Sequence, residues 1–192
     1  MMKKEIAKFF DYYAPTWDDN MIRNEEVIST ILNNAEITEG IHILDVACGT
    51  GILFPDYIRR QVAAVTGIDI SPEMVKIATK KFPEIEVICD DVESHVFDQK
   101  FDVVMVYNAF PHFMDPAKLI QKLATLLVPG GRISIAHGMS RSVLAAHHSG
   151  SASKVSIELL HEDQLAALLK PYFDVDIIVS NDQMYQVSGV KR

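Results

Sequence analysis

The stretch Ile43-Leu44-Asp45-Val46-Ala47-Cys48-Gly49-Thr50-Gly51 decides how the rest of the chain is organised. Its apolar start predicts a buried strand, and the two glycines one residue apart then predict a tight turn. Residues 52–60 can begin a helix directly behind this turn. A strand, a glycine turn and a helix are typical of a nucleotide site. Glycines let a ligand approach the backbone, and the new helix offers unpaired N–H groups.

A second predicted strand, residues 64–69, ends in the acidic residue Asp69. A carboxylate at this place can accept hydrogen bonds from both hydroxyls of a ribose, so the two signals together predict an adenosine-type cofactor. A dinucleotide site would need a third glycine where this chain has Phe54, so a pyrophosphate is disfavoured. S-adenosylmethionine carries no phosphate, and Asp45 can supply the carboxylate partner that its amino-acid end needs.

Further motifs follow in an order that resembles the class I S-adenosylmethionine-dependent methyltransferases, and within them the ubiquinone- and menaquinone-biosynthesis type. They are Asp90-Asp91, the run Phe101 to Phe113, and Leu127-Val128-Pro129-Gly130-Gly131-Arg132. The resemblance implies an α/β fold with a single Rossmann-like, doubly wound sheet of seven strands. The sheet should be mostly parallel with the last strand antiparallel, and helices should cover both faces. The chain departs from the family at Ala47, where glycine is usual and where we expect only a slight shift of the loop.

Hydropathy and turn residues predict the elements of this sheet along the chain. The expected strands are 41–46, 64–69, 85–88, 101–107, 132–137, 175–180 and 184–190. The expected helices are 3–14, 24–34, 52–60 and 161–170, with two more opening at Pro72 and Pro116. Residues 1–192 then form one methyltransferase domain, in which residues 1–22 are an N-terminal lid and residues 138–158 are a cap insertion at the mouth of the sheet.

The first helix and the residues after it contain several aromatic side chains. By the resemblance, this segment folds over the cofactor, and Tyr13 and Trp17 wall the pocket for cofactor and acceptor. The alternative is that these rings only pack the helix onto the core, because their buried area alone would explain them.

The remaining cofactor contacts lie at strand ends. In the family an acidic residue after the third strand receives the adenine amino group, which favours Asp91, with Asp90 as a one-residue alternative. Adjacent acids at a strand end can also form an ordinary solvated turn. The complete set of predicted cofactor-binding residues is Asp45, Ala47, Gly49, Gly51, Asp69, Ile70, Asp91, Val92, Asn108, Tyr13 and Trp17.

The cofactor's methyl group should be presented at the carboxyl end of strand 101–107, because ligands of doubly wound sheets lie outside such ends. Asn108 could place its amide or carbonyl beside the sulfonium. His112 matches a position that is often histidine in the family, and His137 ends the next strand and would face the same mouth. Histidine titrates near neutral pH and suits a base, so these two are the candidate catalytic residues. A histidine in a loop is often only structural, and a base is needed only if the acceptor arrives protonated.

Four histidines, His112, His137, His147 and His148, could converge at this mouth and bind a transition metal. However, His147 and His148 are neighbours in sequence and cannot face the same way on a helix. No zinc-like spacing supports the idea either. The sequence therefore predicts no metal, and it predicts His147 and His148 as polar cap residues.

The composition of the chain limits the classes of methyl acceptor and the cellular location that we expect. The chain has 192 residues, with 18 Lys plus Arg against 26 Asp plus Glu and a formal charge of −8, which disfavours nucleic-acid binding. No stretch approaches about 18 apolar residues, and no apolar leader precedes the first helix, so we expect a cytoplasmic protein without membrane binding. Cys48 and Cys89 match no zinc or C-x-x-C spacing and are expected to be reduced thiols. A monomer and a homodimer are both compatible with the sequence.

The resulting hypothesis is a transferase that moves a methyl group from S-adenosylmethionine to a small-molecule acceptor by in-line displacement. One alternative is a non-catalytic regulator that binds S-adenosylmethionine. A nicotinamide-dependent oxidoreductase is the less favoured alternative, because of Phe54. The identity of the acceptor and the atom that is methylated are not encoded in any motif of the chain.

Overall fold

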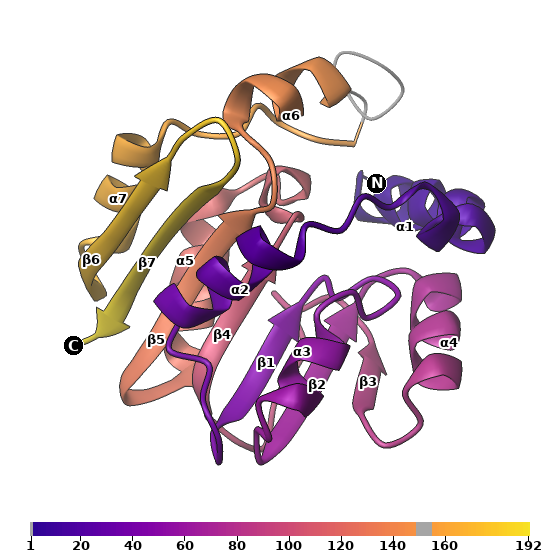
Figure 1. The fold of residues 1–192 in the computed structure, drawn as a ribbon, viewed down its shortest axis with the longest axis horizontal. Coiled ribbons are helices and arrows are strands. Elements are labelled where there is room, and N and C mark those ends of the chain that lie inside the picture. The colour runs from indigo at the N-terminus through magenta and orange to yellow at the C-terminus, as the bar shows by residue number, and fades with distance from the viewer. Residues whose placement is uncertain (1, 149–154) are drawn as a thin grey trace.

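A computed structural model describes residues 2–148 and 155–192 and contains a seven-stranded sheet (Figure 1). The strand order is β3-β2-β1-β4-β5-β7-β6. The strands are β1 His42–Val46, β2 Ala64–Asp69, β3 Glu86–Cys89, β4 Phe101–Tyr107, β5 Leu127–His137, β6 Phe173–Ser180 and β7 Tyr185–Lys191. Strands β1 to β5 pair in parallel, whereas β7 runs antiparallel to both β5 and β6. The predicted fold class is therefore confirmed.

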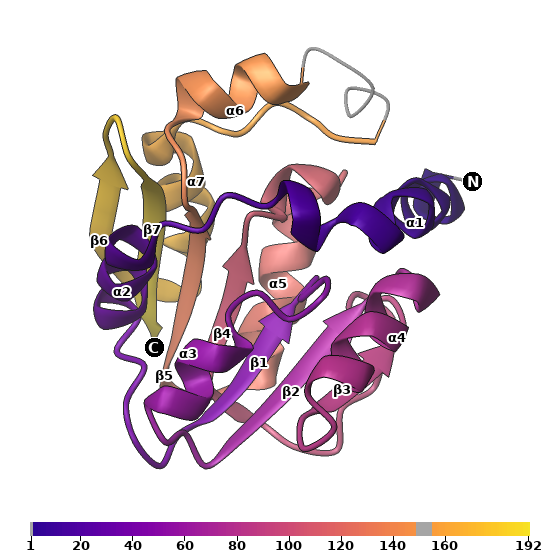
Figure 2. The same cartoon turned by 45° about the vertical axis from the view of Figure 1, so that its right-hand side comes forward.

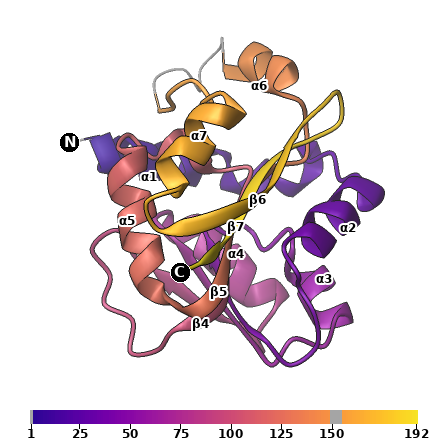
Figure 3. The ribbon, with the colours of Figure 1, turned by 90° about the vertical axis from the view of Figure 1, so that its left-hand side faces the viewer.

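Helices cover both faces of this sheet (Figure 3). They are α1 Met2–Tyr13, α2 Glu25–Asn34, α3 Phe54–Arg59, α4 Pro72–Lys81, α5 Pro116–Leu126, α6 Arg141–His148 and α7 Glu162–Leu169. Short 3-10 turns occupy Ala14–Thr16, Asp18–Asn20 and Phe110–His112. Helices α2, α3 and α4 contribute to one apolar core, and α5 and α7 contribute to a second core on the opposite face.

Three helices begin at a polar residue whose side chain accepts a hydrogen bond from an N–H of the first turn. Asn24 accepts from the N–H of Val27 at 3.2 Å, and Asp115 accepts from the N–H of Lys118 at 3.0 Å. In the same way Ser71 Oγ caps α4.

Two segments differ from the expected boundaries. Strand β5 begins at Leu127 rather than Arg132, and residues 129–131 form an irregularity inside the strand, where the register with β4 shifts. Residues 141–148 of the predicted insertion form helix α6, which the sequence did not indicate.

The carboxyl ends of β1, β2 and β4 point to one edge of the sheet, and α1 and α6 lie beyond that edge (Figure 2). Helix α1 packs against α4 rather than against the sheet itself. No helix within the two described ranges combines the length and the hydropathy needed to cross a membrane.

Candidate cofactor and acceptor site

A cavity of about 1000 Å³ lies at the carboxyl ends of the strands. Its walls come from the strand ends, from residues 3–24 and from the start of α6. It brings together the following predicted residues: Tyr13, Trp17, Asp45, Ala47, Gly49, Asp69, Ile70, Asp91, Val92, Asn108 and His112. Gly51 and His137 do not line it.

The turn after β1 uses three left-handed backbone positions, Ala47 (φ 53°), Gly49 (φ 56°) and Gly51 (φ 84°). A Cβ at Gly49 would meet no atom within 4 Å, so this glycine opens the turn to the cavity. A Cβ at Gly51 would lie 2.6 Å from the Phe54 ring, so Gly51 is needed for packing behind the turn. Ala47 adopts the backbone of the usual glycine at a cost of about 1–2 kcal/mol.

Asp69 is buried at the end of β2 and holds the turn together. Its Oδ2 accepts the N–H of Gly49 at 2.9 Å, and its Oδ1 accepts the N–H of Ser71 at 2.8 Å. Each carboxylate oxygen has a further lone pair, so two more hydrogen bonds can be accepted from a ligand. Burial raises the pKa of Asp69 to about 6, although the two N–H bonds oppose the shift.

Asp45 lies beside it at the end of β1 and is only 3% exposed. Burial raises the pKa of Asp45 to about 7; the nearby Tyr57 hydroxyl opposes this shift and the charge of Asp69 adds to it. Two neighbouring carboxylates with raised pKa values favour a cation, because a positive ligand would stabilise both charged forms.

Asp90 and Asp91 follow β3, and both line the cavity. Asp90 accepts the N–H of Asp91 at 2.8 Å and pairs with His95, while Asp91 accepts the N–H of Glu93 at 3.1 Å. They are thus turn residues as well as cavity residues. The second oxygen of Asp91 forms an ion pair with Lys3 of α1.

Asn108 has a left-handed backbone (φ 54°) at the end of β4. Its side-chain oxygen accepts the N–H of Gly138 at 2.9 Å, and its own N–H donates to the carbonyl of Ala136 at 2.9 Å. Asn108 therefore fastens the ends of β4 and β5 together and forms part of the cavity wall at that point.

Of the two histidines proposed as catalytic, the structure brings only His112 to the cavity. Its Nδ1 lies 3.1 Å from the carbonyl oxygen of Val155, and because a carbonyl only accepts, Nδ1 carries the proton. The ring also meets Phe10 edge-on at 4.9 Å, so His112 joins α1 to the segment after α6. His137 is fully buried, with its ring 6.1 Å from that of Tyr185.

The side chains of His147 and His148, and the small polar run 149–153 of the predicted cap, lie outside the described residues. Among the residues that are described, no three His, Cys, Asp or Glu side chains are grouped to hold a metal ion.

Sequence reasoning missed the polar residues that fasten the N-terminal segment across the cavity. Asp18 accepts from Thr50 Oγ1 of the glycine turn at 2.5 Å and pairs with Lys81 of α4 at 2.7 Å. Asp11 accepts from Ser71 Oγ at 2.6 Å. Charged residues in a polar segment resemble any solvated surface, so no pattern in the sequence could have found these contacts.

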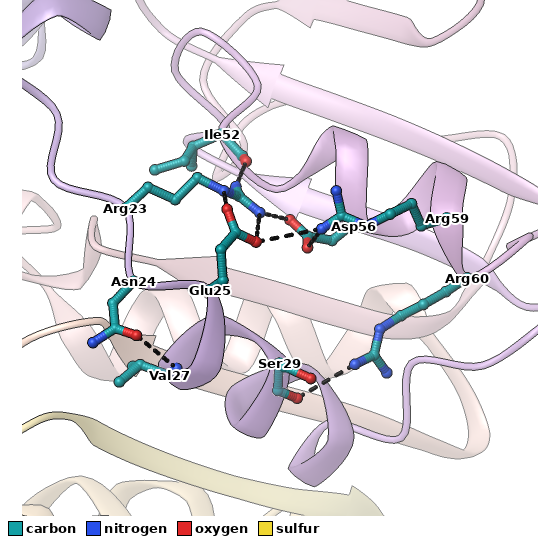
Figure 4. Close-up of polar contacts among 9 residues, drawn as sticks. All are labelled: Arg23, Asn24, Glu25, Val27, Ser29, Ile52, Asp56, Arg59 and Arg60. Carbon is teal, nitrogen blue, oxygen red and sulfur yellow. Dashed lines mark hydrogen bonds and ion pairs between the residues drawn. The ribbon is translucent and has the colours of Figure 1, made fainter.

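Arg23 provides a further missed contact, at the point where the N-terminal segment leads into α2 (Figure 4). Its guanidinium group donates to the carbonyl of Ile52, behind the glycine turn, and pairs with Glu25 and with Asp56 of α3. Asp56 is buried and also pairs with Arg59. The base of the N-terminal segment is thereby tied to the turn that follows β1.

Comparison with known proteins agrees with this geometry. Residues 44–135 match a protein family described as a methyltransferase domain. The chain is 29% identical over 141 residues to a ubiquinone biosynthesis O-methyltransferase of Coxiella burnetii, covering 68% of this chain and 60% of that protein. It is 36% identical over 143 residues to a demethylmenaquinone methyltransferase of Chlorobaculum tepidum, covering 67% and 57%. The chain belongs to the class I S-adenosylmethionine-dependent methyltransferases.

S-adenosylmethionine is the cofactor of this family. The chain spans less than two thirds of the length of those two relatives, at 60% and 57%. Its fold is similar to that of the N-methyltransferase NodS from Bradyrhizobium japonicum WM9 in complex with S-adenosyl-L-homocysteine, with a TM-score of 0.76. The two chains are 13% identical, and the similarity covers 97% of this chain and 98% of NodS.

Proposed function

We propose that this chain transfers the methyl group of S-adenosylmethionine to a small-molecule acceptor. The observation that carries the proposal is the pair of buried carboxylates, Asp45 and Asp69, which flank an open glycine turn in one cavity. S-adenosylmethionine carries a sulfonium and an ammonium group, and such a ligand compensates two acidic side chains in a way that a dinucleotide pyrophosphate does not.

For each group of S-adenosylmethionine, the cavity contains a residue suited to bind it. The two unused lone pairs of Asp69 can accept the ribose hydroxyls, and Asp45 can accept the ammonium group of the methionine end. Gly49 and Ala47 let the cofactor approach the backbone. Ile70 and Val92 would contact the adenine ring from either side, and Asp91 would accept the adenine amino group. Because Asp91 is paired with Lys3, that last contact has to displace or share the ion pair.

The acceptor atom would attack the methyl carbon in line with the C–S bond, and the sulfur would leave as the neutral thioether of S-adenosylhomocysteine. Since the donor is intrinsically reactive, the protein mainly aligns the two molecules and excludes water. Tyr13 and Trp17 wall the cavity on the side of α1 and would serve this exclusion. For an acceptor that arrives protonated, His112 would take the proton at Nε2, because Nδ1 is held by the Val155 carbonyl.

The small-molecule acceptor is supported by two observations. The relatives named above act, according to their names, in ubiquinone biosynthesis and on demethylmenaquinone. In addition, the formal charge of −8 disfavours a nucleic acid, which would need a basic surface.

Calorimetric titration with S-adenosylmethionine, S-adenosylhomocysteine and NADH tests the cofactor site. Asp69→Ala should weaken S-adenosylhomocysteine binding at least about 100-fold, because two hydrogen bonds to a charged group are lost. Asp174→Ala, which removes an exposed carboxylate paired with Arg192, is the control and should bind within about twofold of the parent. Thermal unfolding verifies that both variants fold. Unchanged affinity in Asp69→Ala, or binding of NADH alone, would refute the assignment.

Methyl transfer itself is tested with labelled S-adenosylmethionine and a panel of small phenols, amines and thiols. Transfer to any of them is the expected result. Tight cofactor binding without transfer to any acceptor class would favour the non-catalytic regulator instead.

A further inference from the structure

One part of the cavity extends beyond the predicted cofactor contacts. The strand order places the ends of β4 and β5 and the β6–β7 turn on the opposite side of β1 from β2 and β3. We call this part the acceptor lobe. The residues used below to describe it are Met21, Ile22, Tyr107, Met139, Val143 and Gln183.

The wall of the acceptor lobe is mostly apolar and comes from separate segments of the chain. Met21 and Ile22 precede α2, Met139 follows β5, and Val143 belongs to α6. Ile22 is 94% exposed and Val143 is 44% exposed, although both line the cavity. Large apolar side chains at a cavity mouth gain about 25 cal/mol per Å² when a ligand covers them. The lobe is therefore suited to a ligand with an apolar body.

Positive charge is lacking on this side of the cavity, as far as the described residues show. Among the described residues, the lysine and arginine side chains that line the cavity are those of Lys3 and Lys118. Lys3 is paired with Asp91 and Glu93 at the cofactor end. Lys122 of α5 donates to the carbonyl of His95, in the loop after β3. Lys118 lies one turn earlier on the same face of the helix, so it too lies toward the adenine end of the cavity.

Arg23 comes near the acceptor lobe but does not line it, because its guanidinium group is bonded to Glu25, Asp56 and the Ile52 carbonyl. The charged residues that do line the cavity after β4 and in the β6–β7 turn, among those described, are the acidic Asp115 and Asp182. A phosphate or carboxylate on the acceptor would therefore lose its hydration without gaining a cationic partner among the described residues.

The inner end of the lobe offers an uncharged polar group. Tyr107 is buried at the end of β4, and its hydroxyl lies against Gly138, where a Cβ would be only 2.2 Å from Tyr107 Oη. The glycine therefore makes the space that this hydroxyl occupies. Burial raises the pKa of Tyr107 to about 12, with Asn108 opposing the shift, so the hydroxyl stays protonated and can donate or accept a hydrogen bond.

We propose that the acceptor is an uncharged molecule with an apolar body, whose nucleophilic atom is held by the Tyr107 hydroxyl, and that phosphorylated and carboxylated metabolites are excluded. The inference rests on the proposed function. For an alcohol or phenol acceptor, the C–O bond forms as the C–S bond breaks. The sulfonium charge is neutralised, and the proton of the acceptor passes to His112 or to water.

The test uses three probes with the same ring system: 2-naphthalenemethanol, 2-naphthoate and 2-naphthylmethylammonium. Their binding is measured by calorimetry to the full chain saturated with S-adenosylhomocysteine. We expect the alcohol to bind at least 10-fold more tightly than the carboxylate and more tightly than the ammonium. Tighter binding of either ion, or no binding of the alcohol, would overturn the inference. Failure of S-adenosylhomocysteine itself to bind would instead refute the proposed function, so the two failures are distinguishable.

Two variants sharpen the result. Ile22→Lys should improve 2-naphthoate binding about 10-fold, whereas Val96→Lys, at an exposed valine outside the cavity, should leave it unchanged. Tyr107→Phe should weaken the alcohol several-fold more than the other two probes, and Tyr172→Phe is the control outside the cavity. Equal effects of the two lysine variants, or of the two phenylalanine variants, would place the acceptor elsewhere.

Discussion

Replacing Asp45 with asparagine should stabilise the fold at neutral pH and weaken its binding of S-adenosylmethionine. Burial raises the pKa of Asp45 from 3.8 to about 7. The unfolded chain ionises this group at its ordinary pKa. Between about pH 4 and about pH 7 the folded state therefore keeps a proton that the unfolded state has lost, and stability falls as the pH rises through that window. The difference of about three pKa units corresponds to about 4 kcal/mol, and water entering the cavity reduces this to about 2 kcal/mol.

Asparagine has the same shape as aspartate and never ionises, so the penalty disappears in the variant. Urea unfolding at pH 4, 6 and 8 measures the difference in the free energy of unfolding between the variant and the parent. We expect the variant to be more stable by about 2 kcal/mol at pH 8 and by almost nothing at pH 4. Calorimetric titration at pH 8 should show S-adenosylmethionine binding about 10- to 100-fold more weakly, because a charged hydrogen bond to the ammonium group is lost.

Asp69→Asn is the matched comparison, because the two acids lie in the same cavity but are held differently. Asp69 accepts backbone N–H groups on both oxygens, at 2.9 and 2.8 Å. An asparagine there keeps only one accepting oxygen, so one buried N–H loses its partner and we expect no gain in stability. Our explanation is that the ionised carboxylate of Asp45 destabilises the fold when no cationic ligand is bound. If Asp45→Asn were no more stable than the parent at pH 8, this explanation would be wrong.

Three other substitutions test separate parts of the structure. Ala47→Gly relieves a left-handed alanine (φ 53°) but makes the unfolded chain more flexible, so urea unfolding should change by less than about 1 kcal/mol in either direction; a larger loss would mean that the alanine methyl packs. Lys3→Ala frees Asp91 for the adenine amino group, and since an exposed ion pair contributes at most about 1 kcal/mol, calorimetry should show S-adenosylhomocysteine binding up to about fivefold more tightly, with a smaller dependence on salt; weaker binding would show that Lys3 contacts the cofactor. Arg132 is 4% exposed and bonds both oxygens of Asp176, whose side chain is exposed, so Arg132→Met leaves a carboxylate that water can solvate and should lower the free energy of unfolding by about 1 kcal/mol without changing cofactor affinity; a loss of about 3 kcal/mol or more would contradict this.

The sheet could be predicted from local patterns because each strand carries its own signal. Strands β2 and β4 have the predicted limits, 64–69 and 101–107, since each is an apolar run bounded by turn residues. The caps Asn24, Ser71 and Asp115 likewise indicate where their helices begin, because each forms a hydrogen bond to a residue three positions later. These features depend on residues within four positions of one another, which is the range over which sequence patterns are informative.

The contacts across the cavity could not be predicted because they join residues far apart in the chain. Lys3 meets Asp91 over 88 positions, and Asp18 meets Thr50 over 32 positions. Nothing near either partner distinguishes such a lysine or aspartate from one that faces solvent. Helix α6 was missed although Ser140 Oγ accepts the N–H of Val143 at its start, because one serine after a strand end is as typical of a turn as of a helix cap.

His137 shows that the sequence can predict where a residue lies along a strand without predicting the direction of its side chain. Its position at the end of β5 predicts the correct edge of the sheet, but the direction of its side chain depends on the pleat and on the neighbouring strand. Antiparallel pairing with β7 sets Tyr185 opposite His137, and the ring is enclosed in the core, while Gly138, one residue further, lines the cavity. A strand-end histidine is therefore a weaker indication of a base than one in the loop beyond the strand, such as His112. The backbone there has already turned away from the pleat, and the ring meets the cavity, α1 and the segment after α6 together.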